Sequence, residues 1–158
     1  MKEIISYDPS NGKALGTVIV KDHAQIKAVI QQAVIDQKAW SQTDIVKRVK
    51  LVSEAFQSIQ HQSNKLSELL AKEMGKDIRR ASGEVSGALY MGEYLANDTQ
   101  NALKTRHVSS NTQIEYKALG VVAVVSPWNY PLMMAINLIV PALIAGNSFV
   151  WKPSDKTP

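Results

Sequence analysis

The sequence predicts an α/β protein in which a layer of amphipathic helices precedes the first strand–helix–strand unit of an incomplete parallel sheet. Two observations support this class. Apolar residues recur at helical spacing through most of residues 22–103. Two short, continuously apolar runs, residues 121–125 and 148–151, flank an uncharged segment of helix length, and such runs are typical of parallel strands that are covered on both faces.

The N-terminal part is expected to hold one edge strand and four helices. Turn-forming residues at positions 7–13 precede a β-branched run at 17–20, which we interpret as a turn followed by an edge strand. Asp22 and Gln25 have the spacing of a capping box, so the first helix is expected over residues 22–39. The later apolar stripes predict three more helices, from Asp44 to Ile59, from Leu66 to Met74 before Gly75, and from Asp77 to about Leu103.

The C-terminal part is expected to form strands around one helix. Alternating polar and apolar residues at 113–117 predict a half-exposed strand. The apolar run at 121–125, a helix over 132–145 and a second strand at 148–151 would then form a βαβ unit. The crossover in such units is right-handed in nearly all proteins.

The composition argues against several classes of protein. The 18 basic and 14 acidic residues are scattered, so the net charge of +4 indicates neither a nucleic-acid partner nor a basic membrane anchor. There is no cysteine, the three histidines lack metal-ligand spacing, and no metal is expected. The N-terminus does not resemble a signal peptide, so a cytoplasmic protein is expected. Residues 131–151 have the length of a membrane span, but Asn137, Pro141 and Gly146 favour a buried helix, turn and strand.

The most specific patterns lie in three C-terminal segments. They are Ser126-Pro127-Trp128-Asn129-Tyr130-Pro131, Pro141-Ala142-Leu143-Ile144-Ala145-Gly146-Asn147 and Lys152-Pro153-Ser154-Asp155-Lys156-Thr157-Pro158. Upstream, the matching segments are residues 8–12, Ala39-Trp40, residues 73–76 and residues 83–85. In order and spacing, these segments resemble the NAD(P)-dependent aldehyde dehydrogenase superfamily over nearly the whole chain. The resemblance implies the N-terminal portion of an oxidoreductase that converts an aldehyde, such as succinic semialdehyde, into a carboxylate.

The resemblance gives Asn129 a catalytic role. Aldehyde oxidation passes through a tetrahedral adduct whose oxygen becomes negatively charged, and a neutral amide donor stabilises that oxygen. The family uses the asparagine of its Pro-Trp-Asn motif in this way, and Asn129 stands at that position. The local sequence alone is explained equally well by an Asx turn or a helix cap at Asn129.

The resemblance also implies NAD or NADP as cofactor, although no Gly-x-Gly-x-x-Gly fingerprint is present. Lys152 matches the lysine that the family uses for the adenosine ribose, while its position alone suggests an exposed lysine that ends a strand. Asp155 would repel the 2′-phosphate of NADP, which favours NAD slightly. The expected cofactor-binding residues are Val125, Ser126, Pro127, Trp128, Lys152, Ser154 and Asp155.

Four further residues receive structural interpretations. Lys76 and Glu84 match the family's pattern, but salt bridges on a helical surface suffice to explain them. Trp40 and Trp151 lie where apolar stripes end and are expected in the core.

Three regions are expected along the chain: an edge strand and helices of the cofactor-binding domain at 1–103, an oligomerisation-type strand segment at 104–118, and the start of the dinucleotide-binding βαβ unit at 119–158. The catalytic domain would be absent. The family's mechanism needs a cysteine nucleophile, so a truncated chain without cysteine is expected to be inactive alone. A homodimer or tetramer is implied for the complete protein. The alternative is a non-catalytic nucleotide-binding or subunit-pairing module.

Overall fold

The computed structural model describes residues 2–158 and contains mixed helices and strands in the order expected of an α/β chain. The elements are β1 (Glu3–Tyr7), β2 (Ala14–Ile19), α1 (His23–Ser41), α2 (Ile45–Gln60), α3 (Ser63–Met74), α4 (Ile78–Ala102), β3 (Arg106–Ser109), β4 (Thr112–Ile114), β5 (Val121–Val125), α5 (Pro131–Ile144) and β6 (Ser148–Lys152).

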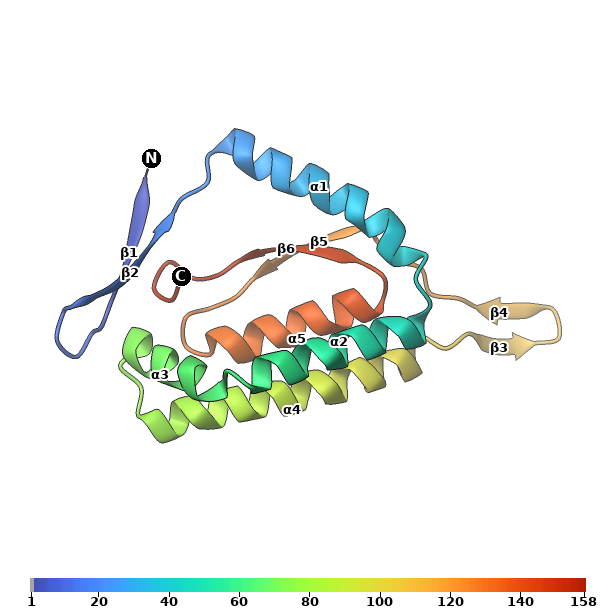
Figure 1. Ribbon diagram of the computed structural model, residues 1–158. Coiled ribbons are helices and arrows are strands. Elements are labelled where there is room, and N and C mark those ends of the chain that lie inside the picture. Colours follow the sequence, from blue (N-terminus) through green and yellow to red (C-terminus); the bar gives the residue numbers. More distant parts are fainter. Residues whose placement is uncertain (1) are drawn as a thin grey trace.

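The elements form layers around one short parallel pair of strands. Helix α1 lies over one face of β5 and β6, while α5 lies on the other face and packs against α2 and α4 (Figure 1). Two hairpins stand at opposite ends of the molecule, β1–β2 beside the chain termini and β3–β4 at the far end (Figure 1). The predicted α/β class with a helical layer and an incomplete parallel sheet is confirmed.

The N-terminal hairpin contains one strand more than the sequence predicts. The expected edge strand at 17–20 corresponds to β2, which pairs antiparallel with β1. Strand β1 is not predicted by the sequence, because most of its residues are at least partly exposed and only Ser6 is buried. The hydroxyl of Ser6 donates to the carboxylate of Glu73 at 2.6 Å, so the hairpin is joined to the end of α3.

Several helix boundaries lie at the expected signals, although α3 begins at Ser63 rather than Leu66 and α1 continues to Ser41. Asp22 and Gln25 form the predicted capping box at the start of α1. Gly75 ends α3 with φ of 63°, and a Cβ at this residue would lie 2.8 Å from Cγ of Pro9. Glycine is therefore required at this turn by both conformation and space. The chain then reverses and enters α4, whose N-cap Asp77 accepts a hydrogen bond from the amide of Arg79.

The main core lies where α2, α4 and α5 meet. Its buried residues are Val52, Phe56, Ala88, Ala96, Ile136, Val140 and Ile144. The ring of Phe56 lies directly against Gly92 of α4, where a Cβ would overlap it. Small residues on α4 thus allow α2 to approach closely. A second cluster, between α3 and α4, contains Leu70, Ala81 and Val85.

The βαβ unit has the expected parallel arrangement. Val121 pairs with Ser148 and Val125 pairs with Lys152, so both strands end at the same level. At the opposite end, the side-chain oxygen of Asn147 accepts hydrogen bonds from the amides of Leu119 (2.7 Å) and Gly120 (2.9 Å). The segment suspected of membrane character forms α5, a turn and β6. No helix among residues 2–158 combines the length and apolar character needed to cross a bilayer.

The predicted strand at 113–117 is wrong in extent. Only Thr112–Ile114 forms β4, and it pairs with β3, a strand that the sequence analysis did not anticipate. Every residue of β3 is exposed and the run carries no apolar alternation, so its signal is weak. Residues 115–118 lead without regular structure to β5.

Burial is low in α1 and at the two tryptophans, and the expectation that Trp40 and Trp151 lie in the core is corrected. The apolar stripe of α1 remains largely exposed, with Val29 at 37% and Ile30 at 43%, and Ala33 is the buried residue of this helix. Trp40 is partly buried and its indole N–H donates to the carbonyl of Leu143 at 2.8 Å. Trp151 is 43% exposed and does not lie in the core.

Candidate functional site

The carboxyl ends of β5 and β6 bring two loops together. The loop after β5 contains residues 126–130, and the loop after β6 contains residues 153–158. The amide of Ser126 donates to the carbonyl of Lys152 at 3.3 Å, and the indole of Trp151 donates to the hydroxyl of Ser126 at 2.8 Å. Ser126 is therefore buried as a link between the strands. In open α/β sheets, ligands bind at this end of parallel strands.

The predicted cofactor residues form one surface around this link. Val125 is 65% exposed and Trp128 is 48% exposed, while Pro127 also faces solvent. Lys156 Nζ lies 5.3 Å from the centroid of the Trp128 ring, so the two loops meet through a cation–π contact. The sequence analysis assigned nothing to Lys156, although it stands in the matched segment.

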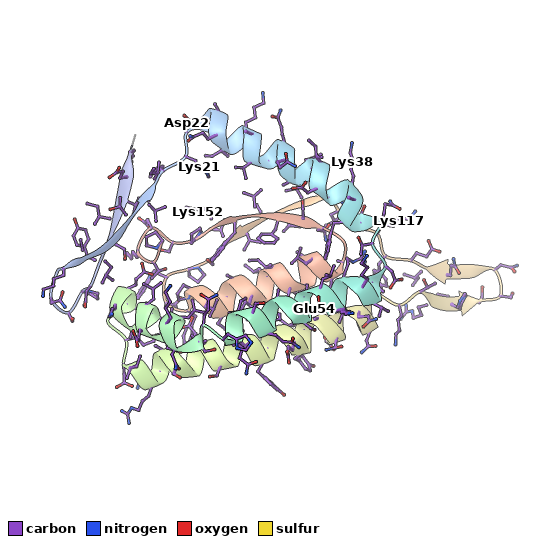
Figure 2. All side chains as sticks on the ribbon, in the orientation of Figure 1. Lys21, Asp22, Lys38, Glu54, Lys117 and Lys152 are labelled. Carbon is purple, nitrogen blue, oxygen red and sulfur yellow. The ribbon has the colours of Figure 1, made fainter. Side chains whose placement is uncertain are left out.

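The remaining predicted cofactor residues lie at the end of β6 and in the loop that follows it. Lys152 is exposed, and its ammonium donates to the carbonyl of Pro153 at 2.9 Å. Figure 2 shows Lys152 toward the end of the sheet where the N-terminal hairpin stands, with Lys117 at the opposite end. The hydroxyl of Ser154 donates to the carboxylate of Asp155 at 3.4 Å and accepts from the amide of Lys156. A cation, a hydroxyl and a carboxylate thus lie within one short loop.

Asn129 lies in the loop before α5 and is exposed. Its backbone carbonyl accepts a hydrogen bond from Lys76 Nζ at 3.2 Å. Asn129 is not the helix cap that local sequence allowed, because Tyr130 is the N-cap residue and contributes no side-chain hydrogen bond. Within residues 2–158, no hydrogen bond engages the side-chain amide of Asn129. That amide is available to donate to a bound group.

Glu84 and Lys76 occupy positions that the sequence analysis did not foresee. Glu84 is 3% exposed and lies on the buried face of α4, contrary to the expected surface salt bridge. One carboxylate oxygen accepts from the amides of Leu132 (3.2 Å) and Met133 (3.4 Å), at the start of α5. The other accepts from Lys76 Nζ at 2.5 Å. Both residues stand in segments that match the family's pattern, eight positions apart, and this match is the one sequence signal that sets them apart from other charged residues.

The arrangement suits a nucleotide better than a metal. Among the residues that the structure describes, no three histidine, aspartate or glutamate side chains gather as a metal site would require. The exposed residues Val125, Pro127 and Trp128, the cation of Lys152 and the carboxylate of Asp155 instead offer groups that can contact a nucleotide. The side chains present therefore fit a dinucleotide.

Comparison with solved structures defines the class of the fold. The structure superimposes with a TM-score of 0.90 on an NAD-dependent benzaldehyde dehydrogenase from Corynebacterium glutamicum, at 27% identity, covering 99% of this chain and 35% of the other. The fold is thus that of the N-terminal part of an NAD(P)-dependent aldehyde dehydrogenase.

Comparison of sequences identifies the family. A profile of the aldehyde dehydrogenase family matches residues 1–158, and the chain belongs to this family. It is 31% identical to a D-glyceraldehyde dehydrogenase (NADP(+)) from Picrophilus torridus, over 98% of this chain and 32% of the relative. It is also 31% identical to an N-succinylglutamate 5-semialdehyde dehydrogenase from Novosphingobium aromaticivorans, over 99% of this chain and 33% of the relative. The chain spans about a third of the length of these relatives.

Proposed function

We propose that this chain forms part of an NAD(P)-dependent oxidoreductase that oxidises an aldehyde to a carboxylate. In this proposal, the chain supplies one wall of the dinucleotide site and the oxyanion donor Asn129. The observation that carries the proposal is the meeting of the two loops at the carboxyl ends of β5 and β6, held by the Ser126–Lys152 hydrogen bond. Membership of the aldehyde dehydrogenase family supports it.

The dinucleotide would be held by both loops. The segment from Val125 through the buried Ser126 and the exposed Pro127 to Trp128 would line its cleft, and Lys152 would bind ribose hydroxyls or phosphate. Ser154 and Asp155 would complete the ribose contacts as acceptors. When bound, the oxidised nicotinamide supplies a hydride acceptor for the carbon of the substrate.

Asn129 would act on the aldehyde substrate. Its free side-chain amide can donate to the aldehyde oxygen as negative charge develops there, without a proton transfer. Its backbone carbonyl accepts a hydrogen bond from Lys76 Nζ, which limits the positions that the side-chain amide can reach. Removing a single oxyanion donor of this kind lowers kcat by roughly 100-fold to 1000-fold in other enzymes.

The nucleophile must come from elsewhere. The family's chemistry uses a cysteine thiolate, and these 158 residues contain no cysteine. We therefore infer that this chain alone does not turn over an aldehyde. Semialdehydes, such as succinic semialdehyde, are the proposed substrate class, in keeping with the semialdehyde dehydrogenase among the relatives.

The proposed cofactor is NAD or NADP, with a slight preference for NAD. The charge of Asp155 would repel the 2′-phosphate of NADP. The D-glyceraldehyde dehydrogenase among the relatives is named for NADP, and the benzaldehyde dehydrogenase is described as NAD-dependent. Asp155 is exposed, so solvent screens this repulsion and the preference is small.

A binding experiment tests the nucleotide site. Titration of the ¹⁵N-labelled chain with NAD⁺ is expected to shift the backbone amide signals of the non-proline residues within 125–129 and 152–155. The substitution Lys152→Met is expected to raise the Kd for NAD⁺ at least about tenfold, since one charge-assisted contact contributes roughly 1.5–3 kcal/mol. Lys117→Met is the matched control, because Lys117 is an exposed lysine at the other end of the sheet (Figure 2). Equal Kd values for the two variants would contradict the proposed site.

We also propose that the β3–β4 hairpin takes part in pairing subunits, as a homodimer or tetramer of the complete protein. It projects away from the packed helices (Figure 1), and all four residues of β3 are exposed. An exposed strand offers unpaired backbone groups to a second chain.

A further inference from the structure

Glu84 is an acidic residue in the protein interior, where acidic side chains are rarely found. Its side chain is completely inaccessible, and the side chain of its partner Lys76 is only 13% exposed. Burying two opposite charges costs desolvation energy that their attraction does not always recover. A buried pair is therefore weak support for stability alone, and its geometry needs another explanation.

The geometry of the pair points to the loop that holds Asn129. The carboxylate of Glu84 accepts from the amides of Leu132 and Met133, which belong to the first turn of α5. These amides have no partner within the helix, and a negative charge is favourable at a helix N-terminus. Tyr130, the N-cap residue, provides no such cap. A side chain from α4 thus caps a helix that begins about fifty residues later in the sequence.

Lys76 contacts the same loop at Asn129 and Tyr130. Its ammonium donates to the carbonyl of Asn129 at 3.2 Å and lies 4.4 Å from the centroid of the Tyr130 ring. Its backbone position is fixed, because it directly follows the left-handed turn at Gly75. The ion pair therefore connects the carbonyl of Asn129 with the start of α5, on either side of the two-residue junction between them.

We propose that Glu84 and Lys76 are positioning residues for Asn129. The pair fixes the carbonyl of Asn129 and the first turn of α5 that follows it, and so limits the directions in which the side-chain amide of Asn129 can donate. This inference rests on the proposed oxyanion role of Asn129, but the contacts that it invokes exist independently of that role. They can accordingly be tested without any measurement of aldehyde oxidation.

The substitution Glu84→Gln tests the proposal with little change in shape. The neutral amide no longer compensates the charge of Lys76, and its oxygen is a weaker acceptor for the two amides. In the ¹⁵N-labelled chain, hydrogen exchange of the Leu132 and Met133 amides is expected to accelerate at least tenfold relative to that of Val52. The side-chain NH₂ signals of Asn129 are expected to move.

Three further variants complete the test. Glu93→Gln is the matched control, because Glu93 is an exposed glutamate on the same helix, and it should leave the Asn129 signals in place. Lys76→Met removes the bond to the carbonyl of Asn129 and should move the same signals, whereas Lys76→Arg keeps the charge and should move them less. If Glu84→Gln does not fold, the two Lys76 variants decide the question by this comparison.

The outcomes separate this inference from the proposed function. If the Leu132 and Met133 amides accelerate no more than Val52, and the Asn129 signals stay in place, the pair merely stabilises the fold and the inference is overturned. Moved Asn129 signals in Lys76→Met but not in Lys76→Arg would support it. Failure of NAD⁺ to bind the parent chain would count against the proposed function and would leave these signals unaffected.

Discussion

Gly92 offers a sharp test of the packing between α2 and α4. It lies in the interior of α4, where glycine normally weakens a helix. A Cβ at this position would come within 2.7 Å of both Cε atoms of Phe56, whose ring is 5% exposed in the main core. Gly83 is a matched position on the same helix, because a Cβ there meets no atom within 4 Å. The variants Gly92→Ala and Gly83→Ala therefore differ only in packing.

The expected magnitudes follow from these contacts. Both substitutions gain about 0.8–1.0 kcal/mol from helix propensity. Over-packing of a core typically costs about 1–3 kcal/mol, and overlap with a buried ring belongs in the upper half of that range. Gly83→Ala should thus raise the free energy of unfolding by up to about 1 kcal/mol. Gly92→Ala should lie about 2–3 kcal/mol below it.

Urea unfolding followed by circular dichroism measures this difference. With a slope of about 2 kcal/mol per molar urea, the midpoints of the two variants should differ by about 1 M or more. The slopes themselves should agree, because both variants expose the same surface on unfolding. Equal midpoints would show that Phe56 moves aside without cost, and the close approach of α2 to α4 would then not depend on glycine.

Two other predictions concern local contacts. Trp40→Phe removes the indole hydrogen bond to the carbonyl of Leu143, and we expect a loss of about 1 kcal/mol in the free energy of unfolding by denaturant titration. An unchanged midpoint would argue against that bond. The hydroxyl and amide of Ser10 bond the carboxylate of Asp8 and lower its pKa below the ordinary 3.8. A lowered pKa means that the ionised turn favours folding above the unfolded-state pKa and loses this contribution as pH falls through the folded-state value. Ser10→Ala should raise the Asp8 titration midpoint in NMR, and an unmoved midpoint would contradict this cause.

The helices could be predicted from sequence because their signals are local. The capping box at Asp22 and the stop at Gly75 act within a few residues, and the structure uses both. The strands β1 and β3 could not be predicted in the same way. Each is stabilised by pairing with a neighbouring strand while most of its side chains face solvent, so its sequence carries no clear alternation.

The candidate site, too, could be predicted from the sequence only in part. The two loops at the ends of β5 and β6 could be expected together, because parallel strands end at one edge of a sheet. The burial of Glu84 could not, since helical periodicity gives only its face on α4 and not what that face contacts. Its partners are the amides of Leu132 and Met133, and backbone amides have no sequence signature.

Asn147 has a consequence for the register of the parallel strands β5 and β6. Its side chain joins the entrance of β6 to the entrance of β5, with a contact that spans 28 residues. A slip of either strand by one residue would separate this oxygen from the amides of Leu119 and Gly120, and it would turn every strand side chain to the opposite face. The alignment of the two strands is thus held at their starting points as well as by the backbone pairing along their length. The amide side chain of Asn147 thus helps to fix the register of both strands.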